Sequence, residues 1–254
     1  MSLKLPGHVQ VAPDTEQLFD DLGSALLGNA QRAIQDRGVF HMALSGGGTP
    51  EPFYIRMVTD PKFRGFPWEQ THLWIVDERC VPEDHEKSNV KMIREAMADH
   101  VPIKRSAVHP MPVLADDPAK VYEEEFAAAF PGVTLPEFPR IDFILLGMGG
   151  DAHTASLFPE SPALAITDRW IVTNDGERVV PPPRVTMTYP LINHGREVVV
   201  LLVGIGKHAT LKQIETQYAT GQPDIQELPI TGINPMANDG QLTWYLDTAA
   251  ATGQ

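Results

Sequence analysis

The stretch Ile141-Asp-Phe-Ile-Leu-Leu146, followed by Gly147-Met-Gly-Gly150, decides the fold class. It is a short apolar run that stops at a glycine-rich turn, which is typical of a strand buried on both faces of a parallel sheet. Runs at residues 39–44, 72–76 and 198–203 also end in polar or glycine-rich turns. The repeated pattern therefore predicts a mostly parallel sheet.

Helical periodicity separates these strands. Leucine and alanine recur at helical spacing between Asp14 and Gly38, and further helices are predicted after Ser88-Asn89 and over residues 118–130 and 210–217. Residues 170–173 and 185–188 are further strand candidates, suited to an antiparallel position at an edge, and residues 242–246 are expected to close the sheet. We therefore expect a three-layer, Rossmann-like α/β fold with helices on both faces. No repeat or linker divides the chain, so residues 1–254 are expected to form one domain.

The composition limits the partners. The chain has 20 Lys and Arg against 33 Asp and Glu, a net charge of −13, which argues against nucleic-acid binding through a broad basic surface. Any anion must bind in a locally positive pocket. The lone Cys80 excludes an internal disulfide and fits a reducing compartment. Neither a membrane-spanning run nor the apolar core of a signal peptide is found. We expect a cytoplasmic protein without an obligatory protein partner.

Polar turns follow four predicted strands, at residues 45–49, 77–79, 147–153 and 204–207. Because the carboxyl ends of parallel strands meet at one edge, we expect these turns to share a pocket. The first turn, Ser45-Gly46-Gly47-Gly48-Thr49, precedes Pro50 and a helix, so that its backbone N–H groups suit a phosphate. Taken alone, this turn is equally compatible with a tight connection that binds nothing.

Three cations are candidate anion ligands: Arg79, Arg184 and Lys207. None of them is part of a charged helix face. Arginine offers a bidentate fork to a phosphate, and lysine offers a point charge. Any one of them is also compatible with an ordinary surface cation, but three at the same predicted edge favour an anion site.

Asp151 and His153 place a carboxylate beside an imidazole in the third turn. In one interpretation His153 takes a proton from water and Asp151 stabilises the imidazolium. In a second, Asp151 caps a helix that begins near Thr154 and His153 only packs. In a third the pair belongs to a metal site, although no matching third ligand is found nearby. The residues alone leave these alternatives open.

Other motifs are weaker. Ala43-Leu-Ser-Gly-Gly47 approximates the nucleophile elbow of serine hydrolases, but that elbow normally follows several strands. Two stretches, residues 147–152 and 204–209, fit a dinucleotide-binding pattern without the expected context. Cys80 beside Arg79 is more often an inert thiol than an activated one.

Several stretches match one known family in its order, from about residue 15 to the C-terminus. They are Ser45-Gly-Gly-Gly-Thr-Pro50, Asp77-Glu-Arg-Cys-Val-Pro82 with Ser88-Asn89, Gly147-Met-Gly-Gly-Asp-Ala-His-Thr-Ala-Ser-Leu-Phe-Pro159, Pro181-Pro-Pro-Arg-Val-Thr186, Gly204-Ile-Gly-Lys207 and Trp244-Tyr-Leu-Asp247. On these stretches the chain resembles the 6-phosphogluconolactonase family. It departs from the family at Gly48, where serine is common, and at Ala152, where glycine is common. A methyl group at Ala152 restricts the backbone if the turn needs a positive φ.

The resemblance implies hydrolysis of 6-phospho-D-glucono-1,5-lactone in the oxidative pentose phosphate pathway, without a metal or an organic cofactor. Together with the first interpretation of the pair, the resemblance suggests His153 as the general base and Asp151 as the carboxylate that orients it. The oxyanion would be held by amides of Gly149 and Gly150 or of Gly46 and Gly47. The remaining candidate substrate and phosphate ligands are Ser45, Gly48, Thr49, Asp77, Arg79, Arg184 and Lys207.

Two alternatives remain. A glucosamine-6-phosphate deaminase/isomerase shares the glycine-rich turn and the Asp-x-His pair, but its relatives carry a further carboxylate after the histidine, which Thr154-Ala-Ser-Leu-Phe-Pro159 lacks. A non-catalytic phosphosugar-binding domain would keep the anion ligands and would not need Asp151 and His153.

Overall fold

The computed structural model describes residues 3–175 and 183–254. Within them, seven strands form one sheet and three strands form a second. The larger sheet contains β1 (His8–Ala12), β2 (Phe40–Leu44), β3 (Thr71–Ile75), β5 (Val108–His109), β6 (Phe143–Leu146), β9 (Glu197–Leu202) and β10 (Gln241–Asp247). The smaller sheet contains β4 (Asp77–Arg79), β7 (Ile171–Asn174) and β8 (Arg184–Met187). The helices are α1 (Thr15–Arg37), α2 (Glu51–Thr59), α3 (Asn89–Ala96), α4 (Pro118–Ala129), α5 (Tyr189–Asn193), α6 (His208–Thr220) and α7 (Thr248–Thr252).

The strand order of the larger sheet is β1-β10-β9-β6-β2-β3-β5, and neighbouring strands run parallel. From β2 the chain builds outward through β3 and β5, and then returns to place β6 on the other side of β2. The order of building thus reverses between β2 and β6. In open parallel sheets, this reversal opens a crevice at the carboxyl ends of the two strands.

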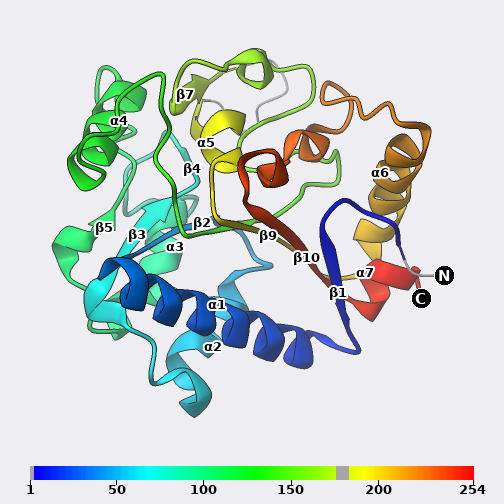
Figure 1. Cartoon of the computed structure of the whole chain (residues 1–254), viewed down its shortest axis with the longest axis horizontal. Coiled ribbons are helices and arrows are strands. Elements are labelled where there is room, and N and C mark those ends of the chain that lie inside the picture. Colours follow the sequence, from blue (N-terminus) through cyan, green and yellow to red (C-terminus); the bar gives the residue numbers. More distant parts are fainter. Residues whose placement is uncertain (1–2, 176–182) are drawn as a thin grey trace.

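Helices cover both faces of the larger sheet, as predicted (Figure 1). In Figure 1, α1 and α2 lie on one side of the sheet, and α5 and β7 lie on the other. The long helix α1 begins where the sequence indicates, because the Asp14 carboxylate accepts a hydrogen bond from the Gln17 amide. It ends at Gly38, whose φ of 76° is the left-handed value that glycine adopts at low cost.

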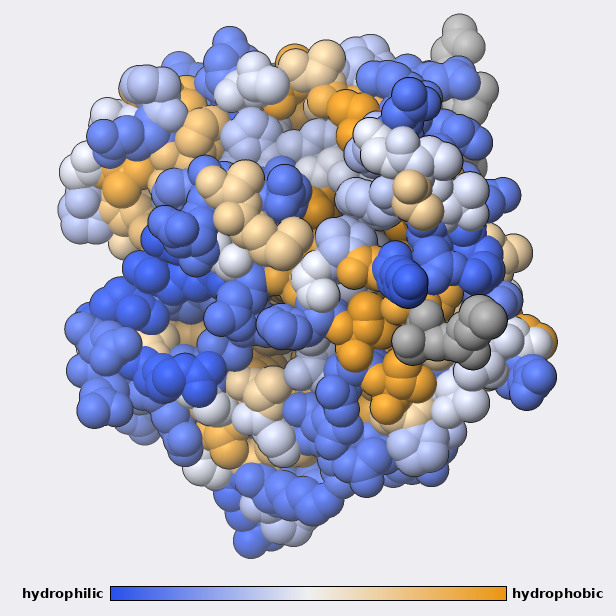
Figure 2. All heavy atoms as spheres, turned by 45° about the vertical axis from the view of Figure 1, so that its right-hand side comes forward, coloured by the Kyte–Doolittle hydropathy of each residue, from blue (hydrophilic) through white to orange (hydrophobic). Residues whose placement is uncertain are grey.

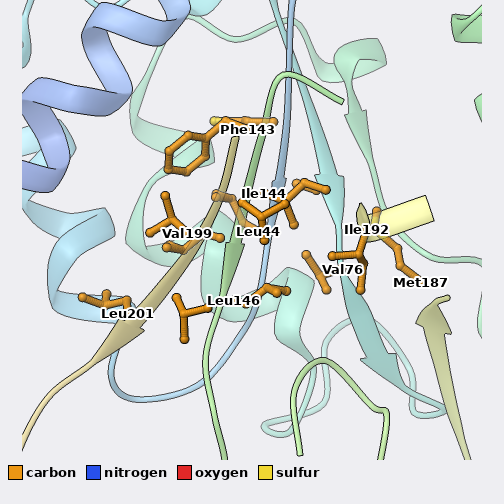
Figure 3. Close-up of a cluster of buried hydrophobic side chains, with 14 of the residues drawn as sticks. Leu44, Val76, Phe143, Ile144, Leu146, Met187, Ile192, Val199 and Leu201 are labelled. Carbon is orange, nitrogen blue, oxygen red and sulfur yellow. The ribbon is translucent and has the colours of Figure 1, made fainter. Parts of the chain in front are cut away.

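The core lies between the two sheets and the helices. Every residue of β2 and β6 is buried, which explains why these strands are continuous apolar runs without alternation. In Figure 3, side chains of the central strands, among them Ile144, lie near Met187 from β8 and Ile192 from α5. The Met187 amide also donates to the Val76 carbonyl, 2.9 Å away. The smaller sheet is therefore anchored to the larger one at the end of β3.

Three expectations about strands were wrong. Residues 242–246 do not close the sheet, because β1 pairs with β10 beyond them. The antiparallel strands do not lie at an edge of the parallel sheet but form the separate sheet β4-β8-β7. Residues 77–79 are not a turn but strand β4, which pairs with β8. Pro181 and Pro182 of the proline motif lie outside the described residues.

The surface is mixed. On the face shown in Figure 2, hydrophobic groups are interspersed with hydrophilic ones. Within residues 3–175 and 183–254, no helix combines the length and the apolar character needed to cross a bilayer.

Candidate active site

A cavity of about 350 Å³ opens where β2 and β6 end, at the reversal of strand order. Its lining comes from the turns after β2, β6 and β9 and from β4 and β8. All four predicted polar segments contribute to it. The predicted residues that line it are Ser45, Gly46, Gly47, Gly48, Thr49, Asp77, Arg79, Gly149, His153, Arg184 and Lys207.

The turn after β2 presents unpaired amides to this cavity. The Ser45 amide donates a hydrogen bond to the Leu145 carbonyl. The amides of Gly46, Gly47 and Gly48 make no hydrogen bond to any residue that the structure describes. The Ser45 hydroxyl is also buried without a partner in this part of the chain. No base therefore activates it, which disfavours the serine-hydrolase alternative.

Gly46 is required by close packing. A Cβ atom at this position would lie 1.9 Å from Oδ1 of Asn89. No atom of residues 3–175 and 183–254 lies within 4 Å of the corresponding position at Gly48, so this part of the chain leaves room for the serine that is common there in the family.

Glu78 fixes the next part of the wall. Its side chain is 1% exposed and accepts hydrogen bonds from the amides of Arg79, Asn89 and Val90, each at 2.8 Å. The Ser88 hydroxyl, which caps α3, adds a fourth bond at 3.2 Å. Burial raises the pKa of the Glu78 carboxyl. This carboxylate at the first turn of α3 holds the backbone of β4 and α3 together beside the cavity.

The three predicted cations line the cavity in different environments. Nη1 of Arg79 donates to Oδ1 of Asn89 and to the Lys87 carbonyl, both at 2.7 Å, whereas its Nε is buried without a partner among residues 3–175 and 183–254. Nζ of Lys207 donates to the Met148 carbonyl at 2.6 Å. Arg184 is buried, which lowers its pKa, and its Nη1 lies 3.8 Å from Oδ2 of Asp77.

Asp77 is held from several directions. Its Oδ2 accepts a hydrogen bond from the Ser156 hydroxyl at 2.6 Å, and its carbonyl accepts one from Nδ2 of Asn89. The residue is buried. Among the described lining residues it is the one carboxylate.

Asp151 and His153 form a direct pair, with 2.5 Å between Oδ1 and Nδ1. The hydrogen bond from His153 lowers the pKa of Asp151. With its proton on Nδ1 facing the carboxylate, the imidazole keeps Nε2 as its acceptor, and Nε2 makes no hydrogen bond to the described residues. The ring stacks on Phe158 at 4.4 Å between centroids. His153 lines the cavity, whereas Asp151 stands outside it and is half exposed.

The turn that carries this pair is unusually tight. A Cβ atom at Gly149 would lie 2.2 Å from Nδ1 of His153, so glycine is needed for the ring to pack there. Ala152 is fully buried and has a φ of 62°, so the turn does need a positive φ and the methyl group has not prevented it. No helix begins near Thr154; instead Thr154 forms an isolated bridge with Leu157. The helix-cap interpretation of Asp151 is therefore wrong.

Some predicted residues lie elsewhere. Gly150 does not line the cavity but lies with Asp151 on a neighbouring depression. The Gly149 amide donates to the His153 carbonyl at 2.8 Å and is not available to a substrate. Burial raises the pKa of the Cys80 thiol, the opposite of what an activated thiolate needs. The part of the chain that the structure describes contains no group of three or more His, Cys, Asp or Glu side chains placed to hold a metal.

Several lining residues were not predicted. Asn89 was considered only as a helix cap, and Phe158 only as part of a motif, yet both line the cavity. Their position in the sequence could have identified them as lining residues. Asn89 follows the cap of α3, and Phe158 lies five residues after His153 of the Asp-x-His pair.

The comparisons with known proteins agree with this geometry. A model of the family described as glucosamine-6-phosphate isomerases/6-phosphogluconolactonase matches residues 13–244. The chain belongs to this glucosamine-6-phosphate isomerase/6-phosphogluconolactonase family. A 6-phosphogluconolactonase from Synechocystis sp. is 43% identical, covering 86% of each chain, and one from Nostoc sp. is 38% identical, covering 95% of this chain and 96% of the relative.

A solved structure supports the same membership. The 6-phosphogluconolactonase from Trypanosoma cruzi is 26% identical, with a TM-score of 0.78 over 98% of this chain and 97% of that one. The family description joins an isomerase and a lactonase.

Proposed function

We propose that this chain hydrolyses 6-phospho-D-glucono-1,5-lactone to 6-phosphogluconate. The observation that carries the proposal is the His153 ring, paired through Nδ1 with Asp151 and facing the same cavity as the amides of Gly46–Gly48. A base and an anion-binding turn thus share one small space. The naming of the Synechocystis and Nostoc relatives as 6-phosphogluconolactonases supports the choice of substrate.

In the proposed reaction, Nε2 of His153 takes a proton from water while the water oxygen attacks the lactone carbonyl carbon. Asp151 stabilises the imidazolium that results. The bond between the carbonyl carbon and the ring oxygen then breaks, and the ring oxygen takes up the proton. Since the Gly149 amide is already paired, the Gly46–Gly47 amides are the remaining candidates for the oxyanion. The step requires no metal ion or organic cofactor.

The phosphate is assigned to the cations of the cavity. Arg79 and Lys207, with Ser45, Gly48 and Thr49 of the turn after β2, would bind it, and Arg184 would complete the positive lining. We further propose that residues 1–254 act as one domain in the cytoplasm, without nucleic acid or an obligatory protein partner.

The isomerase alternative is disfavoured by the carboxylates of the cavity. An aldose–ketose isomerase needs a group that moves a proton between adjacent carbons. Asp77 is the one carboxylate among the described lining residues, and residues 154–159 after His153 add no second one. A pH-stat assay of acid release from freshly prepared 6-phosphogluconolactone, run beside an ammonia-release assay with glucosamine 6-phosphate, separates the activities. Ammonia release without acid release would contradict the proposal.

We predict that His153→Ala lowers kcat by at least about a hundredfold, because the general base is lost. The exposed His100 provides the control, and His100→Ala should keep the wild-type rate. The rates are measured in the pH-stat assay. Near-normal turnover of His153→Ala would exclude it as the base, and retained binding of 6-phosphogluconate without turnover in the wild type would favour a non-catalytic domain.

Lys207→Ala should mainly raise KM, because its ammonium is assigned to the phosphate and not to the reacting carbon. The loss of one charge-assisted hydrogen bond corresponds to roughly a tenfold increase. Steady-state kinetics over a range of lactone concentrations measure it. An unchanged KM would remove Lys207 from the phosphate site.

A further inference from the structure

A second cavity lies at the opposite end of the larger sheet. Its volume is about 740 Å³, about twice that of the candidate active site. Its lining includes residues next to the amino ends of three strands: Val39 before β2, Asp142 before β6 and Arg196 before β9. The candidate active site lies at the carboxyl ends of the same strands. The two cavities are therefore separated by roughly the length of a strand, about 17 Å.

The floor of this far cavity concentrates positive charge. Three arginines line it: Arg37 at the end of α1, Arg140 and Arg196. Nη2 of Arg37 lies 2.8 Å, and Nε of Arg196 3.2 Å, from the same oxygen, Oδ1 of Asp142. One buried carboxylate thus draws two guanidinium groups together. Among the described lining residues the only other carboxylate is Glu137, so the cations outnumber the anions in a chain of net charge −13.

One of these arginines retains an unused donor. Nε of Arg140 is buried without a hydrogen-bond partner in residues 3–175 and 183–254, whereas Nε of Arg196 already faces Oδ1 of Asp142. Burial, and next the charges of Arg37 and Arg140, lower the pKa of Arg196, as expected for neighbouring cations that are not fully neutralised. Buried polar groups are normally satisfied, so an unpaired donor at a cavity indicates a ligand that accepts hydrogen bonds.

The walls above the arginines are apolar and partly aromatic. Phe130 and Phe138 line the cavity, with prolines 131 and 136 between them in the sequence. The ring of Phe130 packs 4.2 Å from that of His41, and the ring of Phe138 lies 6.5 Å from that of His194. Flat rings and prolines of this kind suit a flat ring of a ligand. Apolar walls with a few convergent polar groups are the usual composition of a small-molecule site.

We propose that this cavity is a second binding site, for an organic phosphate whose other end is a flat ring, as in a nucleotide. Arginine forks bind phosphate in a bidentate manner, and the cavity is large enough for a ring in addition to the phosphate. The proposal is independent of the lactonase reaction, because the described residues that line one cavity do not line the other.

The test is a calorimetric titration with 5′-AMP, adenosine and inorganic phosphate, made on the purified chain and on its Arg79→Gln/Lys207→Gln variant. The three ligands are compared in the variant, because phosphate also has a proposed site in the candidate active site. We expect saturable binding of AMP in the millimolar range or tighter, and binding at least about tenfold weaker for adenosine and for phosphate, each of which lacks one half of the ligand. Equal affinity for AMP and adenosine would refute the role of the arginines. Equal affinity for AMP and phosphate would refute the role of the rings, and the absence of AMP binding would overturn the proposal.

Variants distinguish the two cavities. Arg140→Gln and Arg196→Gln should each weaken AMP binding at least about tenfold, whereas Arg32→Gln, an exposed change on α1 outside the cavity, should not. Phe138→Ala should weaken AMP and leave phosphate unaffected. The double variant Arg79→Gln/Lys207→Gln, which disrupts the candidate active site, should still bind AMP. Loss of binding in that variant, with retention in Arg196→Gln, would assign AMP to the active site and refute the proposal. Circular dichroism verifies that each variant is folded.

Discussion

At the scale of single residues, the candidate active site depends on glycines at two positions where a side chain does not fit. Gly46 and Gly149 are needed because a side chain there would collide with Asn89 and with His153, respectively. Ala152 is the contrasting case, since it adopts a left-handed φ in spite of its methyl group. This conformation costs an L-residue roughly 1–2 kcal/mol. The turn around His153 therefore carries strain that a glycine would avoid.

Gly46→Ala should raise KM roughly tenfold and lower the melting temperature by several degrees, because the new Cβ displaces Asn89 and with it the partner of Arg79. Lactonase kinetics and thermal unfolding measure the two effects.

Gly48 provides the matched control for stability. Its Cβ position is open, so Gly48→Ala should leave the melting temperature unchanged. Equal melting temperatures for the two variants would mean that the contact with Asn89 does not constrain the turn.

At the scale of elements, the site is an arrangement of strand ends held by the first turn of α3. In its four hydrogen bonds the Glu78 carboxylate acts only as an acceptor. Its two oxygens accept from three backbone amides and one hydroxyl. An amide in its place would direct an NH₂ group at another donor. The position of Arg79 and Asn89 thus depends on a carboxylate that does not itself line the cavity.

Glu78→Gln should therefore destabilise the fold by about 1–3 kcal/mol and raise KM, because a buried donor loses its acceptor. Urea unfolding and steady-state kinetics test both effects. Glu95→Gln, an exposed change on α3 whose carboxylate lies 3.9 Å from Lys91, is the control and should alter neither. A stable Glu78→Gln protein with normal KM would show that the carboxylate is dispensable.

The sequence predicted the elements whose signals are local. The long amphipathic helix α1, its Asp14 cap and the all-apolar strand β6 are visible in the pattern of residues. Strand β1 was missed because it lies at an edge with most of its residues exposed, and so lacks an apolar run. Strand β4 was taken as a turn because its three residues are charged, and only its pairing with β8 makes it a strand.

In the candidate site, too, the features carried by short motifs were predictable and the long-range contacts were not. The glycine turn and the Asp151–His153 pair were predictable because each is a short motif. The contact between Gly46 and Asn89 was not, since it joins two turns that only the folded sheet brings together. The exclusion of Asp151 from the cavity also depends on a turn conformation that the residue types alone do not determine.

At the scale of the whole molecule, a histidine cluster near the amino ends of the strands affects acid stability. Burial, and next the charges of His72, His109 and Arg37, lower the pKa of His41 to about 3. Trp74 donates to Nδ1 of its ring at 3.2 Å. In the unfolded chain the same imidazole has a pKa of about 6.5. Stability is therefore lost as the pH falls from about 6.5 toward 3, because only the unfolded chain gains the proton.

Because of His41, the free energy of unfolding should be about 2 kcal/mol lower at pH 5 than at pH 7. His41→Asn should flatten this pH dependence, even if its stability at pH 7 is lower. Urea unfolding at pH 7 and pH 5 provides the comparison, and the exposed His100→Asn should keep the wild-type slope. An identical slope in His41→Asn would exclude this histidine as the source.

The pairing of β1 with β10 has a consequence for biosynthesis. His8 aligns with Thr243, so a ribosome releases the first strand long before β10, its partner in the sheet, is made. Until then β9 presents a bare hydrogen-bonding edge, and partly synthesised chains are exposed to association through it. Truncation shortly before Gln241 should for this reason yield insoluble product and not a smaller working enzyme.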